Sequence, residues 1–377
     1  MANKTARLGD LATYINGYAF KPADWGETGL PIIRIQDLTG NSYQLNRYDG
    51  EYPERIEVND GDVLISWSAS LGVYVWQRGK ALLNQHIFRV VFDKLPVNKD
   101  YFVFAVEHKL AEMESKTHGA TMKHIVKKDF DGTTIPYPPI EKQAEIADHL
   151  RRITSLIDRQ TEQLLLLDQL VKSRFIELFG DPLSNDKGWK KVVIAEVCHT
   201  IFGGGTPSKS HPEYFAGSIP WVSPKDMKSS VINDSIDHIT EEAIAHSTTN
   251  LVPANSVLMV IRSGILKHSL PVAINSLPVT INQDMKAFVP NETVKTAFLM
   301  HFFKAIENDV LAGVRGVTAD NIDFKAFQKR TIIVPPLALQ EQFAAFVEQT
   351  DKSKLAVQKG LQELEILKKS LMQQYFG

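Results

Sequence analysis

The stretch IPYPPIEKQAEIADHL at residues 135–150 recurs as IIVPPLALQEQFAAFV at residues 332–347. The repeat extends beyond this stretch on both sides: residues 118–180 align without a gap to residues 315–377 at a constant offset of 197. The matched identities are Gly119 and Gly316, Thr121 and Thr318, Phe130 and Phe327, Ile135 and Ile332, Pro138 and Pro335, Pro139 and Pro336, and Gln143 and Gln340, and both copies end in Phe-Gly. An internal repeat fixes the number of structural units. The chain is therefore interpreted as a tandem duplication.

The match continues upstream, where it is weaker and gapped. NQH at residues 84–86 faces NQD at 282–284, and LPIIRIQDL from Leu30 faces IPWVSPKDM from Ile219. LGDL from Leu8 faces IAEV from Ile194. The N-terminal portions of the two repeats have thus diverged, whereas the C-terminal portions remain similar.

Each repeat divides into two parts. Residues 1–138 and 181–335 contain short apolar runs such as VLISWSA and SVLMVIRSG, separated by Gly, Pro, Asn and Asp, which predict strands. Residues 139–180 and 336–377 begin after a Pro-Pro pair and predict one long helix each, from Ile140 to Phe179 and from Leu337 to Phe376. The expected class is mixed α+β, with two globular α/β domains and two helices.

The helices carry apolar residues at spacings of three and four, which is typical of a packing seam. At 1.5 Å per residue each helix would be roughly 60 Å long. Since helix one must deliver the chain to the second globule, a packed second helix would run back antiparallel. The expected layout is two globules held apart by an antiparallel coiled coil, related by a pseudo-two-fold axis. The alternative, ordinary helices facing a core, stays open.

Composition sets the class of protein. The 377 residues are 44% apolar and 23% charged, which is typical of a globular chain of two domains. No leader or apolar run of about 20 residues is present, and Cys198 is the single cysteine, so a cytoplasmic location and a small buried thiol are expected. The formal net charge of −2 does not by itself suggest nucleic acid.

These features together resemble the specificity subunits of type I restriction-modification systems. The resemblance covers the whole chain. It is carried by LGDL with a glycine-bearing loop (INGYAF, IFGGGTPSK), LPIIRIQDL, GDVLISWSASLG, the NQ pairs, the two Pro-Pro helix starts, and FIELFGDPLSNDKGW at the junction. No single motif is diagnostic, but their order, present twice, is specific.

The resemblance implies two target-recognition domains, residues 1–138 and 181–335, each reading one half of a bipartite, non-palindromic site on double-stranded DNA. It implies that the spacer helices 139–180 and 336–377 set the distance and dock two methyltransferase (modification) subunits. S-adenosylmethionine would bind in those partners, and ATP and Mg in the restriction subunits that translocate and cut DNA. This chain would hold no cofactor and no metal, would not contact a membrane, and would not be an enzyme by itself.

Enzyme signatures are incomplete in the sequence. YPPI and VPPL lack the Asn or Asp and the aromatic residue of an amino-methyltransferase tetrapeptide, so they are interpreted as helix starts. The Glu-x-Lys fragments at Glu107 and Glu114 lie in a predicted helix with no preceding Pro-Asp. No phosphate loop or zinc spacing occurs.

Base readout needs donors and acceptors on loops that reach a groove. The candidates in the first domain are Arg34, Gln36, Ser66, Ser68, Ser70, Asn84, Gln85, His86, Lys116, Thr121, Lys123 and His124. Those in the second are Thr206, Ser208, Lys209, Ser223, Lys225, Arg262, Ser263, Asn282, Gln283, Thr318 and Asn321. The recurring NQ pair fits a shared structural role as well as base readout, whereas the diverged His86 and Asp284 are better placed to set distinct specificities.

Two other functions stay open. The chain could be the recognition part of a self-contained restriction enzyme, although Met1 and a complete second repeat favour a separate subunit. A purely structural coiled-coil scaffold would leave the two large diverged globules unexplained. Near-neutral charge further predicts weak DNA binding by the isolated chain and tighter binding in a complex.

Overall fold

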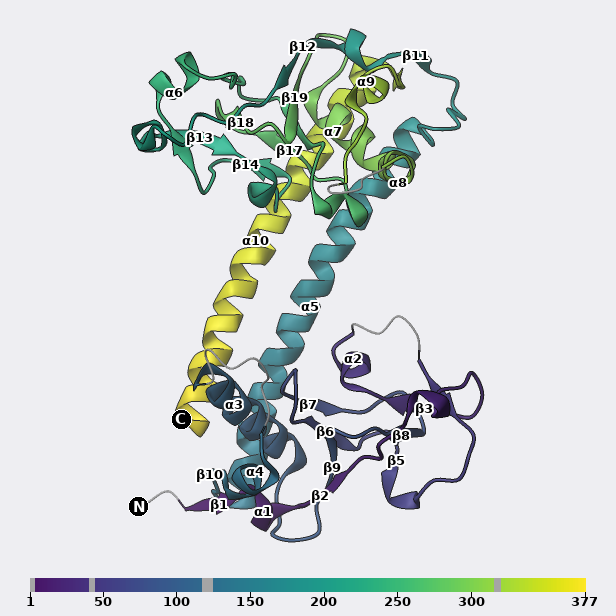
Figure 1. The fold of residues 1–377 in the computed structure, drawn as a ribbon, viewed down its shortest axis with the longest axis vertical. Coiled ribbons are helices and arrows are strands. Elements are labelled where there is room, and N and C mark those ends of the chain that lie inside the picture. The colour runs from purple at the N-terminus through teal and green to yellow at the C-terminus, as the bar shows by residue number, and fades with distance from the viewer. Residues whose placement is uncertain (1–3, 41–44, 117–124, 315–319) are drawn as a thin grey trace. The chain divides into compact units, whose positions relative to one another are not determined.

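A computed structural model describes residues 4–40, 45–116, 125–314 and 320–377. The chain forms two compact units (Figure 1): unit 1 comprises Met1–Thr161 and Gln358–Gly377, and unit 2 comprises Glu162–Val357. Both units combine small sheets with helices, so the mixed α+β class is confirmed. The long helices α5 (Ile140–Phe179) and α10 (Leu337–Phe376) have the predicted bounds, and each contributes to both units.

The described residues of unit 1 form three small sheets. Its strands are β1 (Thr5–Arg7), β2 (Thr13–Asn16), β3 (Leu30–Ile33), β4 (Arg47–Tyr48), β5 (Glu57–Val58), β6 (Val63–Ser66), β7 (Gly72–Val75), β8 (Ala81–Leu83), β9 (Ile87–Val91) and β10 (Thr134–Pro136). Its shorter helices are α1 (Leu8–Leu11), α2 (Ile35–Leu38), α3 (Lys99–Lys116) and α4 (Lys127–Gly132). The strand orders are β2-β9-β6-β7, β4-β3-β8-β5 and β1-β10.

Unit 2 repeats this plan. Its strands are β11 (Lys190–Val193), β12 (Cys198–Gly203), β13 (Ile219–Val222), β14 (Val231–Ile232), β15 (His238–Ile239), β16 (Val257–Val260), β17 (Val272–Asn275), β18 (Thr280–Ile281), β19 (Met285–Pro290) and β20 (Thr331–Val334). Its shorter helices are α6 (Glu241–Ala245), α7 (Thr296–Ala305), α8 (Glu307–Ala312) and α9 (Phe324–Phe327). The strand orders are β12-β19-β16-β17-β14, β15-β13-β18 and β11-β20.

The sheets of the two units therefore correspond strand by strand. The order β2-β9-β6-β7 is matched by β12-β19-β16-β17, and the parallel pair β3 and β8 by the parallel pair β13 and β18. The units differ at the sheet edges: β14 adds a fifth strand in unit 2, whereas β5 extends the other sheet in unit 1. The duplication read from the sequence is thus also a duplication of topology, including the diverged portions.

The long helices begin and end for local reasons. Both start directly after the Pro-Pro pairs, where proline suits the first turn, so the interpretation of YPPI and VPPL as helix starts is confirmed. Gly180 follows the last residue of α5 with a φ of +74°, the left-handed conformation that favours glycine at a helix end.

Inside each unit the two long helices run antiparallel. In unit 1 the Nδ1 atom of His149 lies 3.5 Å from the hydroxyl of Tyr375. In unit 2 Lys354 forms an ion pair with Asp168 at 2.6 Å, and the rings of Phe175 and Phe343 lie 5.5 Å apart. Residue numbers therefore rise along α5 as they fall along α10.

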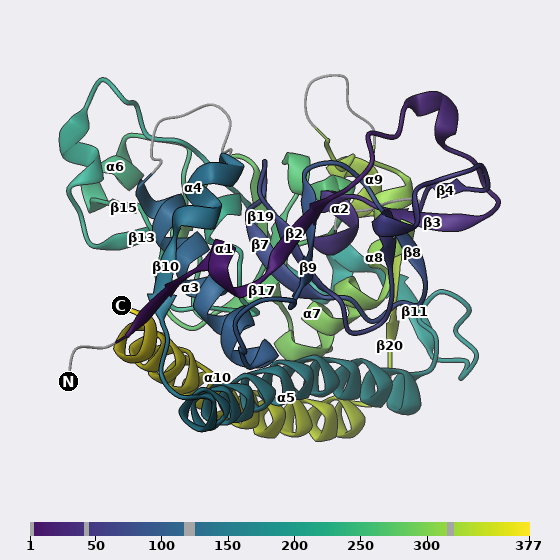
Figure 2. The same cartoon turned by 90° about the horizontal axis from the view of Figure 1, so that it is seen from below.

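Helices α3 and α7 pack against the long helices and close the cores of units 1 and 2. In unit 1 α3 packs beside α5 and α10 (Figure 2), and the ring of Tyr101 lies 5.2 Å from that of Phe376. In unit 2 the residues 197 positions away, Phe298 and Phe179, pack at 4.8 Å. Burying such pairs stabilises each core by about 0.5–1.5 kcal/mol beyond the area that they remove from water.

A buried glutamine ties each long helix to the domain. The Gln143 side chain accepts a hydrogen bond from the Asn98 amide at 2.9 Å and donates one to the Pro138 carbonyl at 2.9 Å. Gln340 makes the equivalent bonds with the Lys295 amide and the Pro335 carbonyl, both at 2.8 Å. The repeated glutamine therefore fixes the start of the long helix against the start of α3 or α7.

Replacing Gln340 with leucine is expected to lower the unfolding free energy of unit 2 by about 3 kcal/mol, since a buried amide and a buried carbonyl lose their partners. Urea unfolding of the full chain measures the loss. The exposed Gln342→Leu, one half-turn along the same helix, is the control and should change stability by less than about 0.5 kcal/mol. Equal stability of the two variants would contradict the assigned role of Gln340.

Candidate nucleic-acid interface

The sheet topology brings three loops of unit 2 to one edge. Gly203 at the end of β12 pairs with Lys286, and Val260 at the end of β16 pairs with Met285, so both strands end where β19 begins. The loops that meet there contain Gly204–Thr206, Ile261–Ser263 and Asn282–Asp284. We call these residues the sheet-end cluster of unit 2.

Unit 1 has the equivalent arrangement. Asn16 at the end of β2 pairs with Phe88, and Ser66 at the end of β6 pairs with Ile87, the first residue of β9. Its sheet-end cluster contains Gly17–Tyr18, Trp67–Ser70 and Asn84–His86. Many of the predicted contact residues, distant in sequence, therefore lie together in each unit.

The backbone amide of the asparagine in each NQ pair extends the pairing of two parallel strands, β3 with β8 in unit 1 and β13 with β18 in unit 2. The Asn84 amide donates to the Ile33 carbonyl at 3.2 Å, and the Asn282 amide donates to the Val222 carbonyl at 2.9 Å. A Cβ atom on Gly17 would lie 2.0 Å from the Asn84 carbonyl oxygen, and one on Gly204 would lie 1.7 Å from that of Asn282. Glycine is therefore required at both positions, and the asparagines serve the fold.

The glutamines of the NQ pairs are exposed in both clusters. Gln283 accepts a hydrogen bond from the Thr206 hydroxyl, which links the glycine loop to the loop before β19. Gln85 lies beside Asn84, whose side-chain oxygen accepts from the Gln85 amide at 2.8 Å. The sequence left open whether the NQ pair has a structural role or reads bases. In the structure the asparagine positions the loop, whereas the glutamine is exposed.

Charge distinguishes the two clusters. In unit 2 Arg262 contacts Asp284 at 2.5 Å from both its Nε and Nη2 atoms. In unit 1 the residue that matches Asp284 is His86, which has a φ of +72° and packs its ring 5.0 Å from that of Trp67. Trp67 in turn stacks on Phe88 at 5.5 Å and packs against the unit 1 core.

Four predicted contact residues are buried: Ser66, Ser68, Ser223 and Asn282. The Ser66 hydroxyl donates to the Ser70 carbonyl at 2.6 Å, and the Ser223 hydroxyl donates to Asp226 at 2.8 Å. The Asn282 side-chain oxygen accepts from the Asp284 amide at 3.1 Å. The hydrogen bonds of Ser66, Ser223 and Asn282 shape the loops, and direct DNA contact by the four residues stays a prediction.

Two matched turns lie next to the clusters. The Asp37 carboxylate accepts from the Arg34 amide at 2.8 Å, and Asp226 accepts from the Ser223 amide at the same distance. The alignment of LPIIRIQDL with IPWVSPKDM is therefore confirmed. The Arg34 side chain is only 16% exposed and lies over the Trp25 ring, whereas Lys225 forms an ion pair with Asp237 at 2.6 Å.

The other predicted residues are placed as follows. Gln36, Ser70, Thr206, Ser208, Lys209 and Asn321 are exposed, and Ser263 is half-buried and accepts from the Ile265 amide at 3.4 Å. Asn321 forms an isolated antiparallel bridge with Arg262. Thr121, Lys123, His124, Thr318 and the side chain of Lys116 lie outside the described residues.

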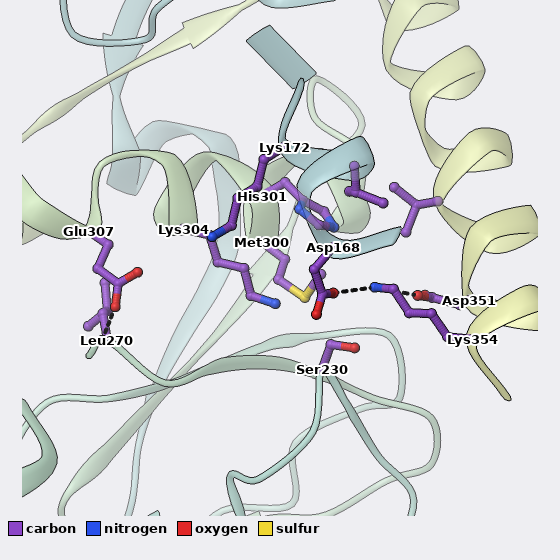
Figure 3. Close-up of a pocket in the computed structure, with 12 residues that line it drawn as sticks. Asp168, Lys172, Ser230, Leu270, Met300, His301, Lys304, Glu307, Asp351 and Lys354 are labelled. Atoms are coloured by element: carbon purple, nitrogen blue, oxygen red, sulfur yellow. Dashed lines mark hydrogen bonds and ion pairs between the residues drawn. The ribbon is translucent and has the colours of Figure 1, made fainter. Parts of the chain in front are cut away.

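Unit 2 also contains a cavity of about 280 Å³ between α5, α7 and α10 (Figure 3), which was not predicted from the sequence. Lys354 contacts Asp168 at 2.6 Å and Asp351 at 3.6 Å in its wall. Burial lowers the pKa of Lys304, and the Lys354 charge lowers it further. One feature of the sequence points to this site: Lys304 lies 197 positions after Glu107, so the equivalent positions of the two repeats have opposite charges.

His301 in the wall of this cavity is held neutral. Burial lowers its pKa to about 3, and its Nε2 atom has no hydrogen-bond partner among the described residues. Between about pH 6.5 and pH 3 the unfolded chain binds a proton that the folded chain does not, so stability falls as the pH falls through this window.

His301→Phe should remove this pH dependence, since phenylalanine keeps an aromatic ring beside Phe343. Relative to the parent, the variant is expected to gain about 2 kcal/mol of stability between pH 7.5 and pH 5. Urea unfolding of both proteins across this range measures the difference. A difference that stays constant with pH would show that folding does not lower the pKa of His301.

Other chemistry is sparse in the part of the chain that the structure describes. No group of three or more His, Cys, Asp and Glu side chains there could hold a metal ion. Cys198 is partly buried against the unit 2 core, and burial raises the pKa of its thiol to about 12, which makes it an unreactive packing residue. Within the described residues no helix is both long and apolar enough to cross a membrane.

Comparison with known proteins identifies the repeated architecture. The family described as the type I restriction modification DNA specificity domain matches residues 2–167 and again residues 186–366. The chain belongs to this family. The resemblance seen in the sequence is confirmed, and the two matches coincide with the two repeats.

Curated specificity subunits are similar over parts of the chain. The Escherichia coli EcoR124I/EcoR124II specificity subunit is 35% identical over 241 residues, covering 62% of this chain and 58% of that protein. The Methanocaldococcus jannaschii MjaIX specificity subunit is 22% identical over 377 residues, covering 92% of this chain and 86% of that protein. The match thus spans little more than half of the E. coli relative.

Solved structures of this family share the fold. The type I restriction-modification S subunit from M. genitalium superposes with a TM-score of 0.61 at 14% identity, covering 99% of this chain and 96% of that one. A chain from a study of complex assembly and conformational transition of the type I R-M system gives 0.57 at 17% identity, covering 99% and 97%. The specificity domains of this chain therefore adopt the architecture known for the family.

Proposed function

We propose that this chain is the DNA-recognition subunit of a type I restriction-modification complex and that each unit reads one half of a bipartite, non-palindromic site. The observation that supports this most is the pair of equivalent sheet-end clusters with different side chains, Arg262 and Asp284 in one and Ser68 and His86 in the other. Two identical recognition domains read a palindrome, whereas two diverged recognition domains can read two different half-sites.

The long helices supply the second part of the proposal. Several leucines of α5 and α10 are exposed in unit 2, with Leu165 at 61%, Leu166 at 55%, Leu170 at 48% and Leu355 at 68%. Apolar side chains gathered on an exposed surface mark protein interaction sites. We propose that the helices dock two methyltransferase subunits and set the spacing between the half-sites.

We assign the catalytic reactions to the methyltransferase and restriction subunits. The sequence has no complete catalytic motif, so S-adenosylmethionine would bind in the methyltransferase subunits and ATP with Mg in the restriction subunits. With a net charge of −2, the chain would need the basic surface of its partners to bind DNA tightly at physiological salt. The complex would act on double-stranded DNA in the cytoplasm.

Two measurements test this function. The purified chain incubated with DNA and S-adenosylmethionine should methylate no adenine, and addition of its methyltransferase subunits should produce methylation at one two-part motif. A salt titration of DNA affinity should show much tighter binding by the complex than by the chain alone. Adenine methylation by the isolated chain would contradict the proposal.

A further inference from the structure

Arg262 is the most accessible charged side chain of the sheet-end cluster of unit 2. Its side chain is 47% exposed, whereas that of its partner Asp284 is 22% exposed. Exposed ion pairs by themselves contribute little stability, usually less than about 1 kcal/mol. The geometry around this pair indicates a role other than stability.

The backbone of Arg262 is fixed on both sides. Its amide donates to the Asp284 carbonyl at 3.2 Å, and the preceding Ile261 amide donates to the same oxygen at 2.8 Å. On the other side Arg262 bridges Asn321, and the Ser263 amide donates to the Asp320 carbonyl at 3.1 Å. The arginine is therefore held at a defined place in the loop.

Asp284 in turn fixes the guanidinium group. The Oδ1 atom of Asp284 binds both Nε and Nη2 of Arg262 at 2.5 Å. Its Oδ2 atom accepts from Asn282 at 3.2 Å and from Gln283 at 3.5 Å, so the carboxylate cannot turn away without losing these bonds. Among the described residues, Nη1 of Arg262 has no hydrogen-bond partner, which leaves the Nη1 and Nη2 edge of the guanidinium available.

A guanidinium with one edge fixed and the other free is suited to one base. Its two parallel N–H groups match the O6 and N7 acceptors of guanine in the major groove, while other bases do not offer two acceptors there. We propose that Arg262, positioned by Asp284, reads a guanine in the half-site of unit 2; this inference rests on the proposed DNA-recognition function.

Unit 1 lacks an equivalent of the Arg262 and Asp284 ion pair, so the two units of one chain can be compared. The register of β6 with β9 and of β16 with β19 places Ser68 at the position of Arg262, and His86 at that of Asp284. Arg34, the nearby arginine of unit 1, is only 16% exposed. The half-site of unit 1 is therefore read by different side chains and should not depend on Arg262.

The test compares variants of the full chain, co-expressed with its methyltransferase subunits in a host without adenine methylation, by sequencing methylated adenines. Arg262→Lys keeps the charge but loses the paired N–H groups. We expect the variant to tolerate other bases at one guanine position of the unit 2 half-site. Methylation of sites that carry another base at this position should rise about tenfold or more relative to the parent, and the preference at the other half-site should be unchanged. Asp284→Asn should relax the same position to a smaller extent.

Arg330→Lys is the matched control, because Arg330 forms an exposed ion pair with Asp309 elsewhere in unit 2, and it should leave the motif unchanged. Unchanged melting temperatures for all variants exclude misfolding. An unaltered motif in Arg262→Lys and Arg262→Ala would overturn the inference, as would uniformly weaker methylation with no change in base preference, which marks a phosphate contact. Absence of any two-part motif for the parent chain would instead contradict the proposed function, and this inference with it.

Discussion

Replacing Gly204 with alanine is expected to destabilise unit 2 by on the order of 3 kcal/mol and to remove its contribution to DNA recognition. A Cβ atom there would lie 1.7 Å from the Asn282 carbonyl oxygen and 2.6 Å from that of Ile281, and backbone atoms cannot move aside cheaply. The loop before β19 would have to shift, which would displace Gln283 and Asp284. Urea unfolding and sequencing of methylated adenines measure the two effects.

Gly264→Ala is the control in the same unit, since no atom lies within 4 Å of its Cβ position. Gly17→Ala should produce the same damage in unit 1, because its Cβ atom would lie 2.0 Å from the Asn84 carbonyl oxygen. If Gly17→Ala and Gly204→Ala both keep full stability and an unchanged DNA motif, the close packing of the glycine loops against the NQ pairs is not needed to position these loops.

The double variant Leu166→Ser and Leu170→Ser is expected to weaken assembly with the methyltransferase subunits about a hundredfold or more. The two leucines lie one turn apart on α5 and are 55% and 48% exposed, so serine should leave the stability of the free chain nearly unchanged. Burying a leucine in an interface contributes roughly 1.5–3 kcal/mol, and both would be lost. Isothermal titration calorimetry with the methyltransferase subunit measures the affinity.

Gln169→Ser on the same helix is exposed and polar and serves as the control, with affinity unchanged within about threefold. Equal affinity of the leucine double variant and this control would show that the partners dock on another surface.

The long helices could be predicted from the sequence to the residue. Pro-Pro marks their start, the absence of an internal proline keeps them continuous, and Phe-Gly marks the end, where Gly180 adopts positive φ. The role of Gln143 and Gln340 could not be derived from their recurrence alone, because their partners, Asn98 and Lys295, differ in side chain and contribute only their amides.

The sheet-end clusters could be predicted in part. Candidate residues were recognised by their donors and acceptors, but their meeting depends on strand register, which joins loops about 80 residues apart, as in the contact of Thr206 with Gln283. The pairing of Arg262 with Asp284 likewise follows from the register of β16 with β19.

Burial and local hydrogen bonds show which candidate residues shape the loops. Ser66 is the last residue of β6, a strand whose four residues are all buried, so the alternation expected of a half-exposed strand does not apply. Ser223 and Asn282 are polar residues that fix turns, a use that a single sequence does not distinguish from ligand contact.

To test whether each unit reads one half of the site independently, residues 181–335 are exchanged for the corresponding segment of a relative with a known, different motif. Methylated adenines are then sequenced in a host that also carries the methyltransferase subunits. We expect a hybrid motif, in which one half and the spacer remain those of the parent chain and the other half becomes that of the donor. A motif in which both halves change, or neither does, would contradict it.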